Sequence, residues 1–232
     1  MTLREQIANL RDESLRALDA SHNYFVHTGS AWRLIQRLVQ QGHKFTVSNQ
    51  ATGSTIGEAE LSSLAQGYIT GYLASATFQD FVAVFERFFF ELVKAWLMKY
   101  PGNLAEKELK FRIVLESVST EDIVAAVVAR EVQGLTYQRV PAWFKELEKL
   151  VKLGCPTQDE IARLAEIKTS RDVLVHNNGI ANSIYIDKSM GHARFASGEK
   201  LELPERYHRE SWVLIKQIVS DISDAAIRKV RS

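Results

Sequence analysis

The sequence predicts an all-α protein, an antiparallel helical bundle that carries one short β-hairpin before its last helix. Its apolar residues recur at three- and four-residue spacing through most of the chain, which is the period of an amphipathic helix. Only four prolines occur in 232 residues, and each lies where a helix would begin or end. Polar segments that contain glycine separate the periodic stretches, as turns and loops do.

The composition is that of an ordinary globular protein, with 46% hydrophobic and 25% charged residues. Lys and Arg (29) nearly balance Asp and Glu (28), so nucleic-acid binding would need a local patch of charge. The single cysteine, Cys155, excludes an internal disulfide and a cysteine-rich metal site. The charged N-terminus is unlike a secretory signal, and charges interrupt the most apolar run, 78–97. We therefore expect a cytoplasmic protein that is not inserted in a membrane.

The first third of the chain is expected to form a helical extension, residues 1–75, that packs on the main domain. Its predicted elements are a helix over 3–20, a helix over 32–41, a loop or short extended piece over 43–57 and a helix over 58–73. Gly67 and Gly71 lower the helix propensity of the last of these.

The main domain, residues 76–232, is built on the strongest helical segment, 77–100. Its phenylalanine-rich apolar face suits the centre of a bundle. Further helices are predicted over 119–133, 141–154, from 156 to the sequence NNG, and over 205–231, with the hairpin inside 183–204.

The sequence TSRDVLVHNNG, residues 169–179, places Arg171 five positions before His176 at a predicted helix end. Chance alone gives about one pair of this kind in such a chain, and three occur. The other two are Arg16 with His22 and Arg37 with His43, and both have the character of ordinary helix ends. The spacing therefore carries little weight, and the surroundings must decide.

The helical wheel places Arg171 near the middle of an apolar arc, with Asp172 inside the arc and His176 at its edge. Glu166, Ser170 and Asn177 fall on the opposite side. Charges on the side of a helix that faces the core need ion-pair partners or a polar cleft, because burying an unpaired charge costs several kcal/mol.

Two interpretations of this stretch remain open. In the structural one, Arg171 pairs with a carboxylate such as Glu86 or Glu131, and His176 caps the last carbonyls of its helix. Asn178-Gly179 then forms the left-handed stop. In the functional one, the histidine transfers protons and the arginine binds phosphate oxygens.

The functional interpretation needs no metal ion if the nucleophile is the 2′-hydroxyl of RNA, which attacks its adjacent phosphate and leaves a cyclic phosphate. Arg171 would stabilise the negative charge that builds on the phosphate oxygens in the transition state, and Asp172 would orient the pair. Asn177 and Asn178 would add hydrogen bonds to the phosphate or the sugar.

The motif and its surroundings resemble the HEPN superfamily (higher eukaryotes and prokaryotes nucleotide-binding domains), in its ribonuclease-type branch. The family signature is an arginine, usually a polar residue, three to five more residues and a histidine, late in an all-α bundle. Here RDVLVH supplies Arg171, Asp172 and His176. The segment FQDFVAVFERFFFELVKAWL resembles the early core helix of the family, with Glu86 as its internal acid. The resemblance covers about residues 77–230.

This resemblance implies a metal-independent endoribonuclease without a cofactor, acting as a toxin, in phage defence or in RNA processing. It also implies a homodimer in which two arginine-histidine pairs line one cleft, and an antitoxin or another defence-system protein as a partner. Two alternatives stay open. One is an inactive HEPN module that binds RNA, nucleotide or protein, and the other is a plain helical scaffold.

Other candidate residues favour ordinary roles. His22 and His27 could bind a metal ion, but no third ligand is nearby and a loop with two solvated histidines is the simpler interpretation. Cys155 has no adjacent base that would activate it. Arg130 and Arg139 could extend an RNA-binding surface, but solvated or ion-paired side chains are the favoured interpretation.

Overall fold

The structure, a computed structural model, describes residues 1–105, 108, 109 and 111–231, and it is helical almost throughout. The all-α prediction is thus confirmed. No helix in this part of the chain is long and apolar enough to cross a lipid bilayer. The elements are α1 (Leu3–Gln40), β1 (Val47–Ser48), β2 (Thr55–Ile56), α2 (Glu58–Gly67), the π-helix η1 (Tyr68–Leu73), α3 (Ala74–Lys99), the 3-10 helix η2 (Pro101–Leu104), α4 (Phe111–Glu116), α5 (Thr120–Thr136), α6 (Val140–Val151), α7 (Gln158–His176), α8 (Ser183–Lys188) and α9 (Glu205–Lys229).

The helix α1 is continuous over 38 residues, whereas the sequence predicted two helices with a break over 21–31. The prediction is wrong because buried positions of α1 include Ser14, Ser21 and Gly29. The helical spacing of apolar residues is interrupted at these small residues, although the helix itself continues. Ser21 Oγ donates a hydrogen bond to the Thr77 carbonyl oxygen at 3.4 Å, so the small side chain brings α1 close to α3.

The predicted hairpin before the last helix is also wrong. Within 183–204 the chain forms the short helix α8, because the Asn182 side chain accepts a hydrogen bond from the Tyr185 amide at 2.9 Å and caps it. One isolated bridge, between Ile180 and Lys200, is the strand-like pairing in this region. The hairpin that the structure does contain joins β1 to β2 at the far end of α1, inside the predicted loop.

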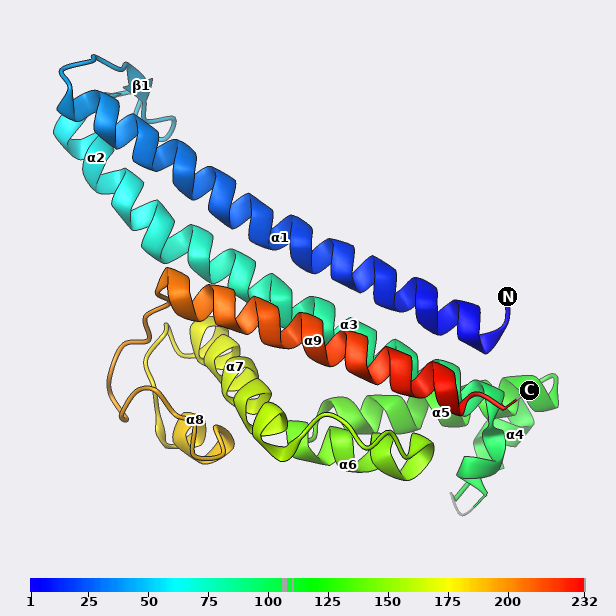
Figure 1. Ribbon diagram of the computed structural model, residues 1–232. Coiled ribbons are helices and arrows are strands. Elements are labelled where there is room, and N and C mark those ends of the chain that lie inside the picture. The colour runs from blue at the N-terminus through cyan, green and yellow to red at the C-terminus, as the bar shows by residue number, and fades with distance from the viewer. Residues whose placement is uncertain (106–107, 110, 232) are drawn as a thin grey trace.

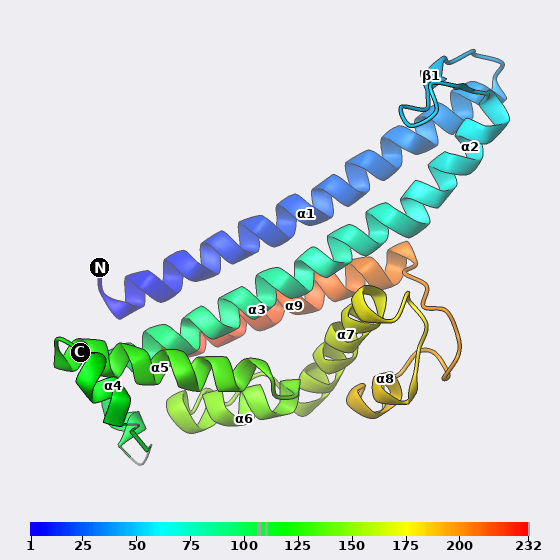
Figure 2. The same cartoon turned by 180° about the vertical axis from the view of Figure 1, so that it is seen from behind.

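Three long helices run side by side and form the frame of the molecule. α1 is antiparallel to the nearly continuous helical path of α2, η1 and α3, and α9 lies along both α1 and α3 (Figure 1). The shorter helices α5, α6 and α7 cover the other side of α3 and α9, and α8 packs on α7, as the reverse view shows (Figure 2). Both chain termini lie at the same end, where Arg4 donates a hydrogen bond to the Val230 carbonyl oxygen at 3.0 Å.

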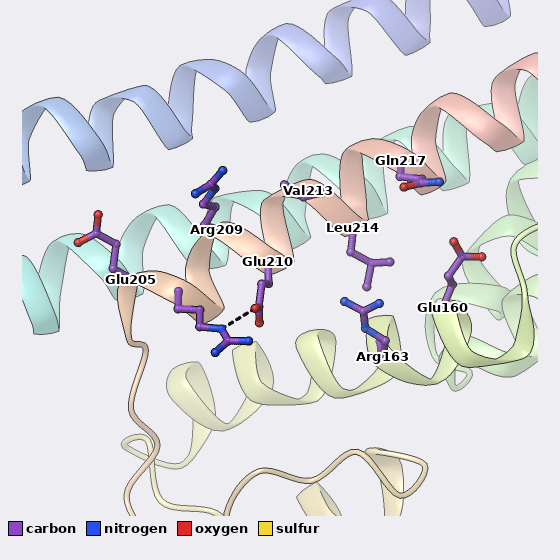
Figure 3. Close-up of a pocket in the computed structure, with 9 residues that line it drawn as sticks. Glu160, Arg163, Glu205, Arg209, Glu210, Val213, Leu214 and Gln217 are labelled. Atoms are coloured by element: carbon purple, nitrogen blue, oxygen red, sulfur yellow. Dashed lines mark hydrogen bonds and ion pairs between the residues drawn. The ribbon is translucent and has the colours of Figure 1, made fainter.

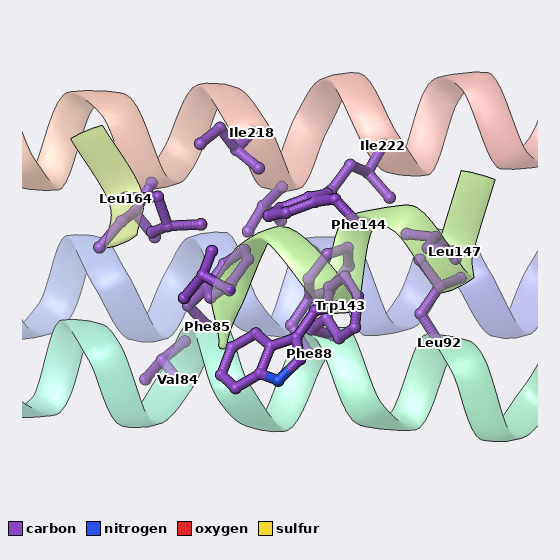
Figure 4. Close-up of a cluster of buried hydrophobic side chains, with 14 of the residues drawn as sticks. Val84, Phe85, Phe88, Leu92, Trp143, Phe144, Leu147, Leu164, Ile218 and Ile222 are labelled. Carbon is purple, nitrogen blue, oxygen red and sulfur yellow. The ribbon is translucent and has the colours of Figure 1, made fainter. Parts of the chain in front are cut away.

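One hydrophobic core joins this frame to the shorter helices. α3 contributes most of it, as its wide apolar face predicted, and α6 inserts Trp143 and Phe144 between α3 and α9 (Figure 4). Four side chains of α1 belong to the same core, so residues 1–75 and 76–232 are not separated by a polar boundary. They are Leu3, Ile7, Leu18 and Phe25.

A buried histidine lies where α1, α3 and α9 meet. His208 is fully buried, and its Nε2 lies 2.8 Å from Thr77 Oγ1. Because Thr77 Oγ1 donates its own proton to the Leu73 carbonyl oxygen at 2.8 Å, Nε2 of His208 must be the donor. Nδ1 has no partner among the described residues. Burial, with a smaller contribution from His22, lowers the pKa of His208 to about 3.

The buried His208 makes stability depend on pH. Below its ordinary pKa of 6.5 the unfolded chain binds a proton that the folded chain refuses until the pH reaches about 3, so stability falls as the pH falls through this window. We expect about 2 kcal/mol less free energy of unfolding at pH 5 than at pH 7.5, from urea denaturation. His208→Gln removes the titration and should remove most of this difference. An unchanged difference in the variant would contradict the assignment.

Candidate functional site

The helix α7 ends as the motif predicted. Thr157 and Glu160 form a capping box at its start, and at its end the amides of Asn177 and Gly179 both donate to the Val173 carbonyl oxygen, at 2.9 and 3.1 Å. Asn178 and Gly179 have φ angles of 51° and 74°, which is the left-handed stop. This stop ends the helix directly after His176.

Arg171 is held between two carboxylates. It forms an ion pair with Glu86 of α3, and its Nη1 lies 3.1 Å from Asp172 Oδ1. Lys168 Nζ lies 2.8 Å from Asp172 Oδ2 and 3.8 Å from Glu86 Oε1. The four side chains are each 19–26% exposed. The structural interpretation of Arg171 is therefore confirmed in its first part, and the partner is Glu86.

Glu86 is the least solvated acid of this group. Burial raises its pKa, although Arg171 and Lys168 oppose the shift by favouring the charged form. The ion pair with Arg171 thus loses its negative partner at a higher pH than an exposed pair would. Glu86 therefore holds the arginine less firmly as the pH falls.

These residues line a cleft of about 640 Å³ between α3, α7 and α8. Its lining consists of Glu86, Arg87, Phe90, Thr136, Lys168, Thr169, Arg171, Asp172, Val173, His176, Asn177, Asn182, Ile184, Tyr185 and Lys188. His176 is exposed and makes no hydrogen bond to any residue that the structure describes. The histidine is therefore not a cap of its own helix, and both ring nitrogens are open to a ligand.

Of the two asparagines predicted to contact the substrate, only Asn177 lines the cleft. The Asn177 side-chain amide donates to the Ile180 carbonyl oxygen. Asn178 is exposed at the left-handed turn and is not among the lining residues, so the predicted contact of Asn178 with a phosphate or sugar is not supported by its position.

The wheel assigned Glu166 and Ser170 to the side opposite the apolar arc, and the structure shows both of them buried, at 3% and 0% exposure. Glu166 accepts hydrogen bonds from Ser170, Tyr185 and Tyr207 and pairs with Arg194 at 3.1 Å. α7 is therefore covered on both sides, by α3 and α6 and by α8 and α9. This network holds one wall of the cleft, because Tyr185 also lines it.

Sequence reasoning missed three cations of the cleft. One, Lys168, lies on α7 itself, three residues before Arg171, and the other two are Arg87 and Lys188. These last two lie about a hundred residues apart in the chain, on α3 and α8, so no local pattern connects them. A weak signal existed for Arg87, which directly follows the acid Glu86 of the predicted core helix.

The other candidate residues have structural roles. His22 and His27 belong to α1 rather than to a loop, and the ring of His22 stacks on Trp212 at 4.2 Å. No group of three or more potential metal ligands occurs in the described parts of the chain. Burial raises the pKa of the Cys155 thiol, which lowers its reactivity.

Both other arginines considered from the sequence are bonded within the chain. Arg130 donates to the Glu108 carbonyl oxygen at 2.7 Å, and Arg139 pairs with Asp187 at 2.6 Å. Their ordinary interpretation is therefore confirmed.

A second hollow, of about 510 Å³, lies between α7 and α9 (Figure 3). Its charged side chains are balanced, three arginines against three glutamates, and the pair Arg206–Glu210 closes at 2.8 Å. Its described lining contains no histidine and carries no net charge, so the cleft at the end of α7 is the better candidate site.

Comparison of the chain with protein-family models, with curated proteins and with solved structures found no match. The cleft is therefore interpreted from its own geometry and chemistry.

Proposed function

We propose that the protein is a HEPN-type, metal-independent endoribonuclease whose active site is the cleft at the end of α7. The observation that carries this proposal is His176, an exposed side chain with both ring nitrogens unbonded within the described chain, in the same cleft as Arg171. A histidine that is free to exchange protons beside a fixed guanidinium fits acid-base catalysis on a phosphodiester.

The reaction uses the hydroxyl of the substrate itself. The RNA 2′-oxygen loses its proton and bonds to the adjacent phosphorus, the bond from phosphorus to the 5′-oxygen breaks, and that oxygen gains a proton. The products are a 2′,3′-cyclic phosphate and a 5′-hydroxyl. His176 transfers protons, Arg171 faces the charge that builds on the phosphate, and Asp172 with Glu86 fixes the direction of the guanidinium.

The same proposal includes the expected setting of the enzyme. A homodimer would bring two copies of the pair Arg171 and His176 to one cleft. The enzyme would act as a toxin, in phage defence or in RNA processing in the cytoplasm, with an antitoxin or defence-system protein as its partner.

A second candidate function is a binding module without catalysis, and the ion pairs of Arg171 favour it. Two of its guanidinium nitrogens already contact Glu86 and Asp172, so its charge is largely compensated before any phosphate arrives. A module of this kind would bind RNA or nucleotide in the cleft and leave it intact.

Incubation of the purified protein with a structured RNA in EDTA separates the two functions. The enzyme is expected to give fragments that end in 2′,3′-cyclic phosphate, because no metal ion takes part in the step. The same RNA with a 2′-deoxy nucleotide at a mapped cleavage position should stay intact at that position only. RNA that is bound but uncut supports the binding module, and fragments with 3′-hydroxyl ends would contradict the proposed chemistry.

A further inference from the structure

The cleft carries an excess of positive charge that its internal ion pairs do not cancel. Its described lining contains four lysine and arginine side chains and two carboxylates, Glu86 and Asp172. Both carboxylates are bonded to Lys168 and Arg171. Two cations remain, Arg87 on α3 and Lys188 on α8, and neither has an ion-pair partner in the described chain.

The acids next to these two cations are engaged elsewhere. Glu91 lies one helical turn after Arg87 but approaches Lys94, at 3.6 Å. Asp187 directly precedes Lys188 but pairs with Arg139 at 2.6 Å. Neither cation is therefore neutralised by an acid of its own helix.

The two cations come from different walls of the cleft. Arg87 is exposed on α3, and Lys188 is half-buried on α8. Two opposed positive charges without counterions attract a polyanion that passes between them, and each phosphate they bind releases condensed counterions. By contrast, the groove between α7 and α9 has as many acids as arginines and offers no such attraction.

We propose that Arg87 and Lys188 are the residues that bind the RNA backbone, by contacting phosphates that flank the reacting one. This rests on the proposed function for the reacting phosphate, which lies at Arg171 and His176. The ion pairs assign the cations different roles. Arg171 is fixed by Glu86 and Asp172 and is oriented for the reaction. Arg87 and Lys188 are not fixed in this way, so their charges can supply binding affinity for RNA.

The test is the affinity of the protein for a 2′-O-methyl RNA oligonucleotide, which cannot be cleaved by this chemistry. Fluorescence anisotropy would compare wild type with Arg87→Ala, Lys188→Ala and the double variant over a range of salt concentrations. Each single variant should raise Kd roughly three- to tenfold, and the double variant should lower the slope of log K against log salt by about 1.4, since each phosphate contact on a single strand contributes about 0.7.

Arg16→Ala and Lys44→Ala are the matched controls. Both residues are exposed, carry no ion pair in the described chain and lie on or beyond α1, outside the cleft. Their Kd should equal that of wild type. Arg87→Lys and Lys188→Arg should keep most of the affinity, which excludes a folding defect as the cause.

The outcomes separate this inference from the proposed function. If the Arg87 and Lys188 variants bind like the controls while wild type cleaves RNA, the inference is wrong and the enzyme stands. If their binding is weakened while wild type never cleaves, Arg87 and Lys188 bind the RNA backbone in a binding module, and the proposed enzyme is wrong. If wild type does not bind the oligonucleotide, the inference is wrong.

Discussion

His176→Ala is expected to lower the rate of RNA cleavage by about 100- to 10,000-fold, the range that a positioned general acid or base contributes. The affinity for uncleavable RNA should change by less than about threefold, because Arg87 and Lys188 supply the phosphate contacts. The measurements are single-turnover cleavage in EDTA and anisotropy with the 2′-O-methyl oligonucleotide. A fall in rate without a fall in affinity is the signature of lost chemistry.

His176 is a cleaner test of catalysis than Arg171. The histidine is exposed and has no hydrogen bond to any described residue, so its removal should change the free energy of unfolding by no more than about 0.5 kcal/mol. Arg171→Ala would instead leave Glu86 partly buried without its main partner, and this costs stability by itself. A loss of activity in that variant alone would not distinguish a reacting group from a structural one.

The chain contains its own control for this experiment. Arg37 and His43 have the motif spacing at another helix end, the end of α1, and line neither of the two hollows described above. Arg37→Ala combined with His43→Ala should leave cleavage unchanged. If that double variant and His176→Ala cleave equally well, within about threefold of wild type, the assignment of His176 to proton transfer is wrong.

The parts of the fold that sequence predicted are those in which local signals agree with tertiary packing. α3 combines a wide apolar face with Pro101 as its end, and α7 combines a capping box at its start with Asn178-Gly179 at its stop. The prediction of two separate helices in place of α1 was wrong because buried positions of α1 hold serine and glycine, which a search for apolar residues does not register. Along this part of α1 the buried positions still recur at helical spacing, although apolar residues do not occupy all of them.

Most of the predictable part of the site lies on one helix, and Glu86 of α3 was expected there only as one of two possible partners of Arg171 and through the family resemblance. Arg171, Asp172 and His176 share α7, so their placement in one cleft followed from the motif and the helix end. Arg87 and Lys188 join them through contacts of α3 and α8 with α7, which no local pattern encodes. From the residues alone, two acids could pair with Arg171, Glu86 and Glu131, and only the structure shows that the partner is Glu86.

Glu166→Ala is expected to lower the free energy of unfolding by about 3–5 kcal/mol, the cost of breaking a buried, hydrogen-bonded charge pair. The Glu166 carboxylate accepts from Ser170 Oγ at 2.7 Å and from Tyr185 Oη at 2.9 Å, and it also binds Tyr207 and Arg194. Burial, with the nearby Glu166 charge as the next cause, raises the pKa of both tyrosines, so both remain donors. Alanine would leave a guanidinium and three hydroxyls without their acceptor.

Urea denaturation at pH 7.5 measures this loss, and two variants on α7 calibrate it. Asp159→Ala removes a carboxylate that is 67% exposed, and it should cost less than about 1 kcal/mol. Glu166→Gln keeps the volume and one acceptor oxygen but loses the charge, so it should fall between the other two. If Glu166→Ala costs no more than Asp159→Ala, the buried network does not hold α7, α8 and α9 together.

Glu166→Ala should also destabilise the cleft, because Tyr185 both lines the cleft and donates a hydrogen bond to Glu166. Without Glu166, α8 is tied to α7 by fewer bonds, and the wall that carries Lys188 should open more often. Hydrogen exchange in Glu166→Ala should therefore increase over 183–204 while α1, on the far side of α9, keeps its protection. Glu166→Ala should also bind RNA more weakly than wild type. If the mobility of the wall that carries Lys188 is the cause, the loss of affinity should equal that of Lys188→Ala. Weaker protection over 183–204 with unchanged affinity would show that Lys188 does not depend on the Glu166 network.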